Sequence, residues 1–178
     1  MPDTSARAPL TVFSILQADI RLVARSREGV RTDVGLTIQP NDSLEAAPSR
    51  FDVLFGPGGL KGTIDAMKDD RTLGFLRTAG EASDFVTSAC TGSLLLGAAG
   101  LLKGYAATSR WYVRDLLPLM GATLRKDRVV EDRNRITAGG VTAGIDFGLA
   151  IAARLAGAGR CFFVRRHPAQ AGSAHPGG

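Results

Sequence analysis

Hydrophobic positions along this chain alternate between short continuous runs and stretches with helical spacing. Continuous apolar runs between turn residues predict strands at Ile20–Ala24, Leu36–Ile38, Asp52–Phe55, Phe85–Ser88 and Tyr105–Ser109. Helical spacing and longer apolar runs predict helices at Pro9–Gln17, Ile64–Met67, Thr72–Glu81, Ser93–Leu102, Trp111–Met120 and Ile145–Leu155. This order of strands and helices predicts an α/β fold around a mostly parallel sheet.

Three local features refine this prediction. A β-hairpin with its turn at residues 132–134 is predicted by Val129, Val130 and Ile136. Pro9 suits the first turn of a helix, so we expect it to open the first helix. The buried face of the last helix is expected at Ile145, Leu149 and residues 152–153.

The length and composition indicate one globular domain. The chain has 178 residues, of which 44% are hydrophobic, and this is enough to bury a proper core. After Ala156 the amphipathic period is lost, and Pro, Gly and Arg become frequent. We therefore expect a domain over residues 1–156 and a loosely structured tail over residues 157–178.

The net charge of +5 does not indicate nucleic-acid binding, because basic residues are interspersed with acids and no recognition pattern accompanies them. The longest apolar run, Ser93–Leu102, is about half of what a membrane span requires. The N-terminus carries no apolar signal segment, and two cysteines make no disulfide framework. We expect a cytoplasmic protein that acts on a small molecule, with no metal, cofactor, nucleic acid or membrane partner.

The most distinctive local feature is Cys90. It follows a predicted strand directly and precedes the buried helix directly. A cysteine at a sharp strand-to-helix turn lies next to helix N-terminal amides, which favour the thiolate and can bind a developing negative charge. A small buried hydrophobic side chain is the alternative interpretation, since free cysteines are commonly buried.

Two glycine-rich loops are expected to lie near Cys90. Gly58 and Gly59 follow a predicted strand, so their amides could form an oxyanion hole together with the amide of Thr91. Gly139 and Gly140 could form a wall of the substrate site. A tight turn and a close-packed loop, respectively, are the alternatives. Parallel strands would bring both loops to the carboxyl edge of the sheet where Cys90 lies.

A thiol nucleophile needs a proton partner, and histidine is the commonest one. The two histidines of the chain, His167 and His175, both lie in the expected tail. A cysteine–histidine pair is therefore not predicted, and a carboxylic acid would have to serve.

These motifs resemble the DJ-1/PfpI superfamily, and most closely its isocyanide hydratase branch. The resemblance runs from about Pro9 to Ala156, and the segments that carry it are Gly56–Gly59, Ser88–Gly104, Ala107–Trp111 and Ile136–Ala153. It implies a flavodoxin-like three-layer α/β/α sandwich of the class I glutamine amidotransferase type, usually a homodimer. Cys90 would be the nucleophile, with Thr91 beside it and the Gly58 or Gly59 amide facing the developing anion.

The chain departs from the family pattern in three places. The family opens with an apolar central strand, which is absent here, and its acid would fall at Ser5, with Asp3 close but out of register. Arg110 stands where relatives carry a histidine. The tail does not resemble the family's final helical segment.

Three functions remain open from the sequence. A Cys90 thiolate could attack an isocyanide carbon, and water would then release an N-substituted formamide. A catalytically degenerate domain could act as a redox-responsive or regulatory sensing module. A glyoxalase-like or deglycase-like activity is the third alternative that the resemblance implies.

Overall fold

The computed structural model describes residues 4–15, 17–31, 35, 37–140 and 143–156, so the expected tail at 157–178 lies outside the described residues. The helices are α1 (Thr4–Ile15), α2 (Leu60–Met67), α3 (Asp70–Ala82), α4 (Gly92–Ala98), the 3-10 helix η1 (Arg114–Met120) and α5 (Ala143–Ala156). The strands are β1 (Val23–Ala24), β2 (Val30–Arg31), β3 (Thr37–Ile38), β4 (Asp42–Ser43), β5 (Val53–Gly56), β6 (Phe85–Ala89), β7 (Ala106–Ala107), β8 (Thr123–Leu124), β9 (Val129–Asp132) and β10 (Arg135–Ala138).

The central sheet has four strands in the order β5-β6-β10-β9. Strands β5, β6 and β10 run parallel, and β9 pairs antiparallel with β10. The mostly parallel sheet and the hairpin are therefore confirmed. Arg133 takes φ = 56° in the hairpin turn, the left-handed conformation that two-residue hairpin turns need.

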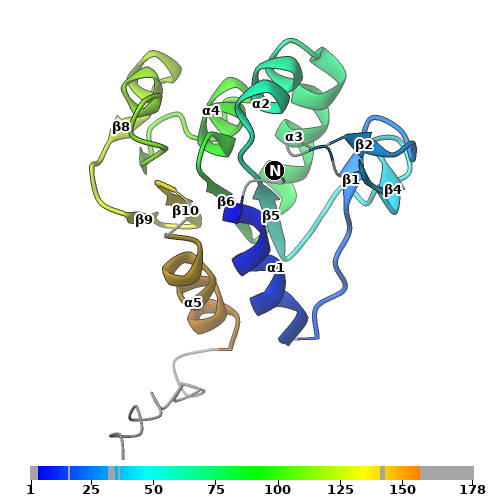
Figure 1. Cartoon of the computed structure of the whole chain (residues 1–178). Coiled ribbons are helices and arrows are strands. Elements are labelled where there is room, and N and C mark those ends of the chain that lie inside the picture. Colours follow the sequence, from blue (N-terminus) through cyan, green and yellow to red (C-terminus); the bar gives the residue numbers. More distant parts are fainter. Residues whose placement is uncertain (1–3, 16, 32–34, 36, 141–142, 157–178) are drawn as a thin grey trace, which may run out of the picture.

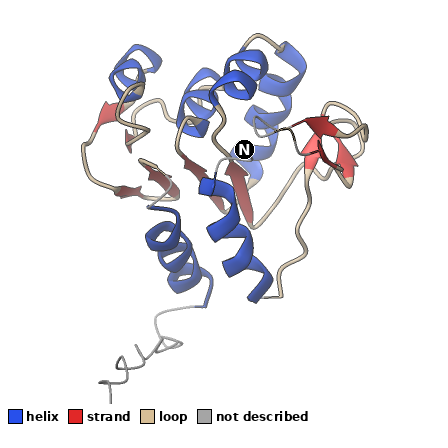
Figure 2. Ribbon diagram, in the orientation of Figure 1, coloured by secondary structure: helices blue, strands red, loops and turns tan. Residues whose placement is uncertain are grey.

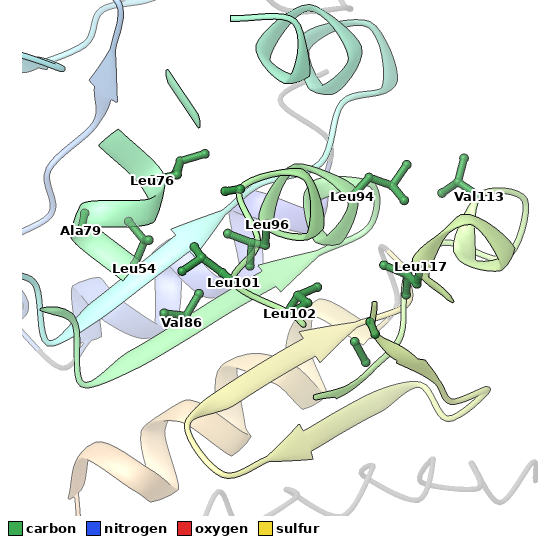
Figure 3. Packing of buried hydrophobic residues seen from close by; sticks show 13 residues of the cluster. Leu54, Leu76, Ala79, Val86, Leu94, Leu96, Leu101, Leu102, Val113 and Leu117 are labelled. Atoms are coloured by element: carbon green, nitrogen blue, oxygen red, sulfur yellow. The ribbon is translucent and has the colours of Figure 1, made fainter. Parts of the chain in front are cut away.

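Helices cover both faces of this sheet, as Figures 1 and 2 show. Helices α2, α3 and α4 lie on one side, where alternate strand residues such as Leu54 and Val86 pack against Leu96 (Figure 3). Helices α1 and α5 lie on the other side, where Ile136 packs with Phe147. The alternation of side chains along each strand feeds two separate cores, which confirms the three-layer sandwich.

The sheet has an open side at β5. Strand β6 is paired on both sides, whereas β5 has no second strand neighbour in the described part of the chain. Strand β1 pairs with β4 in a small separate sheet instead of joining β5. Helix α1 is the first described element, so no described strand precedes it.

Two helix boundaries differ from the prediction. Helix α1 begins at Thr4, so Pro9 is its sixth residue and does not open it. Packing of α1 against α5 outweighs the hydrogen bond that proline cannot donate. Helix α4 ends at Ala98 rather than Leu102, because Gly100 takes φ = 81° and the Leu101 N–H closes the turn onto the Leu96 carbonyl.

The prediction for the buried face of α5 was wrong at Leu149. Phe147 and Ile151 are fully buried, whereas Leu149 is 51% exposed. The Phe147 ring lies 5.5 Å from the Phe55 ring, so contact with β5 fixes the rotation of this helix. The side chains of Ile145 and Ala153 lie outside the described residues.

The other elements differ mainly in length. Strands β1 and β7 are two residues long, and the helix expected at Trp111–Met120 begins at Arg114 as a 3-10 helix containing Pro118. None of the helices in the described ranges combines the length and the apolar character needed to cross a bilayer.

Asp69 caps the N-terminus of α3 and gives a pH-dependent prediction. Its carboxylate accepts from the backbone N–H and the hydroxyl of Thr72 and pairs with Arg25 at 2.9 Å. The Thr72 side-chain hydrogen bond, aided by the Arg25 charge, lowers the pKa of Asp69 from its ordinary value of 3.8. Carboxylate stabilisation of this kind is complete above the unfolded pKa and is lost as pH falls through the folded pKa.

The variant Asp69→Asn keeps a capping side chain but removes the charge. We expect a higher thermal midpoint for the unmodified chain at pH 6, and a difference between the two proteins that shrinks from about pH 4 downwards. Thermal unfolding of both proteins between pH 6 and 3 measures this difference. A difference that stays constant over that range would contradict the role of the Asp69 charge.

Candidate active site at the turn between β6 and α4

Cys90 lies at the sharp turn that joins β6 to α4. Its backbone takes φ = 58°, a left-handed conformation that non-glycine residues rarely adopt. The turn is held on both sides, because the Cys90 N–H donates to the Ala138 carbonyl at 2.9 Å and the Ser109 hydroxyl donates to the Cys90 carbonyl at 2.7 Å. These hydrogen bonds therefore hold the cysteine in a strained conformation. The residue is also buried, with only 1% of its surface exposed.

Gly92 explains why the turn can approach β5 so closely. A Cβ atom at this position would lie 2.0 Å from the Gly56 carbonyl oxygen and 2.7 Å from the Pro57 oxygen. Both neighbours are backbone atoms, which cannot rotate away as a side chain can. Only glycine allows the Cys90 turn to pack directly against the Gly56–Gly59 loop.

Thr91 ties the turn to the first glycine loop. Its hydroxyl oxygen accepts from the Gly59 N–H at 3.0 Å and lies 3.0 Å from the Thr63 hydroxyl of α2. The Gly59 amide is thus engaged with Thr91, and Gly58, half-buried in the same loop, is the other glycine that the sequence placed in an oxyanion role. Sequence reasoning placed the three residues together but did not foresee this bond.

A chain of buried polar side chains positions the segment after β7. The Ser88 and Ser93 hydroxyls lie 2.8 Å apart, Ser93 donates to the Thr108 carbonyl at 2.7 Å, and the Thr108 N–H donates to the Thr137 hydroxyl at 2.9 Å. These bonds link β6, α4 and β10 to the start of the segment that carries Arg110. Sequence reasoning missed this network, because its four residues lie in separate parts of the chain and a hydroxyl side chain gives no local signal of a distant partner.

Arg110, which the sequence marked only as a departure from the family pattern, contacts the candidate nucleophile. One of its guanidinium nitrogens lies 3.6 Å from the Cys90 sulfur, within hydrogen-bond reach for a sulfur acceptor. The guanidinium also lies 5.2 Å from the centre of the Tyr112 ring, which helps to orient it. A fixed positive charge beside a thiol favours the thiolate, which is the nucleophilic form.

This contact predicts the reactivity of Cys90. In the variant Arg110→Leu, we expect alkylation of Cys90 by neutral iodoacetamide at pH 7 to slow by about threefold to tenfold, because the thiolate loses its neighbouring charge and Arg110 is partly exposed to solvent. Peptide mass spectrometry at Cys90 gives the rate. The charge-preserving variant Arg110→Lys should retain most of it, and equal rates in all three proteins would contradict the interpretation.

The second glycine loop lies in the wall of a cavity that is connected to Cys90 through Arg110, which lines the cavity and contacts the Cys90 sulfur. This cavity has a volume of about 360 Å³, and Gly139, Gly140, Ser109 and Arg110 are among its lining residues. An added Cβ at Gly139 would lie 3.3 Å from the Ser109 carbonyl, whereas Gly140 has no atom within 4 Å of such a Cβ. Gly139 is thus close-packed and Gly140 open, and their substrate-wall role stays a prediction.

Other parts of the molecule fit the chemistry less well. Trp111 is 72% exposed and lines the same cavity, so it is a rim aromatic rather than a core residue. A second cavity of about 430 Å³ lies between the β4 region and α3, without a cysteine or histidine among its described lining residues. Within the described ranges, no three His, Cys, Asp or Glu side chains gather as metal ligands would.

The sequence considered two positions for the family's acid, Asp3 and Ser5. Asp3 and the side chain of Ser5 lie outside the described residues, as does Cys161.

The three segments of the site meet because of the sheet. Strands β5, β6 and β10 are parallel, and they end at Gly56, Ala89 and Ala138. The Gly58–Gly59 loop, Cys90 and the Gly139–Gly140 loop therefore share one carboxyl edge, as the sequence predicted.

Comparisons with known proteins agree with this geometry. The model of the DJ-1/PfpI family matches residues 1–154. The chain is 46% identical over 144 residues to the isonitrile hydratase of Pseudomonas putida, covering 81% of this chain and 62% of that protein. It is 31% identical over 132 residues to the protein dj-1beta of Drosophila melanogaster, covering 73% of this chain and 70% of that protein.

Solved structures give the same result. A ThiJ/PfpI family protein from Pseudomonas syringae superposes with a TM-score of 0.83 at 48% identity, covering 85% of this chain and 63% of that one. DJ-1beta of Drosophila melanogaster superposes with a TM-score of 0.78 at 25% identity, covering 86% and 84%. The chain thus spans less than two thirds of the hydratase and of the P. syringae protein. With a strained cysteine between β6 and α4 and a matching fold, the chain belongs to the DJ-1/PfpI family.

Proposed function

We propose that this chain is a cysteine-dependent hydratase that converts isocyanides into N-substituted formamides. The observation that carries the proposal is Cys90, held at φ = 58° on the sheet edge with a guanidinium 3.6 Å from its sulfur. The 46% identity to an isonitrile hydratase supports this substrate class, although the chain spans only 62% of that protein.

The reaction has two steps. In the first, the Cys90 thiolate attacks the terminal isocyanide carbon, a C–S bond forms, and the proton lost from the thiol ends on that carbon. The product is a thioimidate, R–N=CH–S–Cys. In the second, water adds to the same carbon, the C–S bond breaks, and R–NH–CHO leaves as the thiol is restored. No oxidant or reductant is needed, since atoms and electrons balance with water alone.

The residues around the sulfur would have different roles in this reaction. Arg110 would keep the thiolate populated before attack. As the carbon is attacked, negative charge develops on the substrate, and the amides of Gly58 and Thr91 are the proposed donors to it. The Gly59 amide would act indirectly, since its hydrogen bond to the Thr91 hydroxyl holds the turn and the loop together.

The test is turnover of a simple isocyanide. The purified chain, incubated with benzyl isocyanide, should release N-benzylformamide, and rapid acid quenching should trap a thioimidate adduct at Cys90 detectable by mass spectrometry. Incubation without protein sets the background. Absence of formamide above that background would end the hydratase proposal. Absence of formamide combined with rapid peroxide oxidation of Cys90 would instead favour the redox-responsive alternative.

A further inference from the structure

The cavity lined by Arg110 and the Gly139–Gly140 loop is rich in basic side chains. Its described lining residues include four basic side chains and one acid, Asp127; the basic residues are Arg110, Arg114, Lys126 and Arg128. The cavity volume of about 360 Å³ lies at the small end of the range for small-molecule sites. A small cavity with this charge excess is suited to an anion rather than to a neutral ligand.

The positive charge in this wall is only partly compensated by the protein. Arg128 pairs with Asp146 at 3.2 Å, and Arg110 contacts the Cys90 sulfur. The Arg114 side chain, in contrast, forms no hydrogen bond or ion pair with any described residue, and its Nε is buried without a hydrogen-bond partner. A partly buried guanidinium without a partner is costly unless a ligand or water completes its hydrogen bonds.

We propose that this cavity binds a carboxylate of the substrate, and that Arg114 is its principal anchor. The planar guanidinium fork matches a carboxylate, which it can bind through two parallel hydrogen bonds. Arg110 both lines the cavity and contacts the Cys90 sulfur, so a substrate with its carboxylate close to the reacting carbon would suit this arrangement. This inference rests on the proposed function for its substrate class, which becomes small isocyanides with a carboxylate near the nitrogen, such as isocyanoacetate.

The charge preference can be measured without turnover. Iodoacetate and iodoacetamide alkylate the same sulfur and differ in charge. We expect the rate ratio of iodoacetate to iodoacetamide at Cys90 to be at least about tenfold higher in the folded chain than in the urea-denatured chain. Arg114→Gln should bring the ratio close to the denatured value, and Arg114→Lys should retain part of it. Arg125→Gln, which removes an exposed arginine outside the cavity wall, is the matched control.

Binding to a chain without the nucleophile gives a second readout. In the Cys90→Ala variant, calorimetry should show N-formylglycine binding at least about tenfold more tightly than N-formylglycinamide, its uncharged counterpart. Equal affinities, or a preference that persists in the Cys90→Ala/Arg114→Gln chain, would overturn the carboxylate site. Stronger competition by inorganic phosphate than by acetate would also overturn it, in favour of a phosphate-bearing ligand.

The two proposals fail in distinguishable ways. If benzyl isocyanide is hydrated but the charge preference is absent, the carboxylate site is wrong and the hydratase stands. If no isocyanide is hydrated but N-formylglycine binds through Arg114, the anion site stands and the hydratase is wrong. If both hold, kcat/KM for isocyanoacetate should exceed that for its ethyl ester by about tenfold or more, and Arg114→Gln should remove this difference.

Discussion

The Cys90→Ala variant should lose at least about three orders of magnitude of formamide-forming activity while remaining folded. The thioimidate requires a C–S bond, and no other described cysteine could form it. Alanine removes only the sulfur from a residue that is 1% exposed, so the change leaves a small void and preserves the backbone hydrogen bonds of the turn. Product formation followed by mass spectrometry gives the rate, and thermal unfolding checks the fold.

Cys161→Ala is the matched control, because it removes the other thiol of the chain. This control should keep its activity. A Cys90→Ala protein that retains activity within tenfold of the unmodified chain would show that the chemistry does not pass through this sulfur. Cys90→Ser should fall close to the alanine variant, because an alcohol is far less ionised than a thiol at neutral pH.

The Gly92→Ala variant should be destabilised by about 3 kcal/mol or more. The new methyl group would lie 2.0 Å from the Gly56 oxygen and 2.7 Å from the Pro57 oxygen, so one backbone segment must move away from the other. This movement would also break the Gly59–Thr91 hydrogen bond across the same contact. Urea unfolding should therefore show a lower midpoint, and formamide production should fall with it.

Gly62→Ala tests whether adding a methyl group to a glycine is harmful in itself. Gly62 lies in α2 with no atom within 4 Å of an added Cβ, so alanine should stabilise the chain by about 0.5–1 kcal/mol through helix propensity. The two substitutions should thus have opposite signs. A Gly92→Ala chain that unfolds at the same urea concentration as the unmodified protein would refute the close backbone contact at the turn.

Local patterns predicted those parts of the fold that depend on neighbours in sequence. The continuous runs at β5 and β6 and the hairpin of β9 and β10 follow from apolar periodicity and turn residues. The errors arose where packing decided the outcome. Rotation of α5 depends on the contact between Phe147 and Phe55, and the start of α1 depends on its packing against α5.

The sequence by itself determined the position of the candidate nucleophile, since a cysteine between a buried strand and a buried helix is a local signal. It also determined that two glycine loops share its sheet edge, because parallel strands end on the same side. Only the tertiary structure decided how these groups interact. Twenty residues separate Arg110 from Cys90, and their contact depends on buried hydrogen bonds between separate elements. The cationic cavity likewise gathers side chains from several segments, and long-range packing of this kind leaves no periodic trace in the sequence.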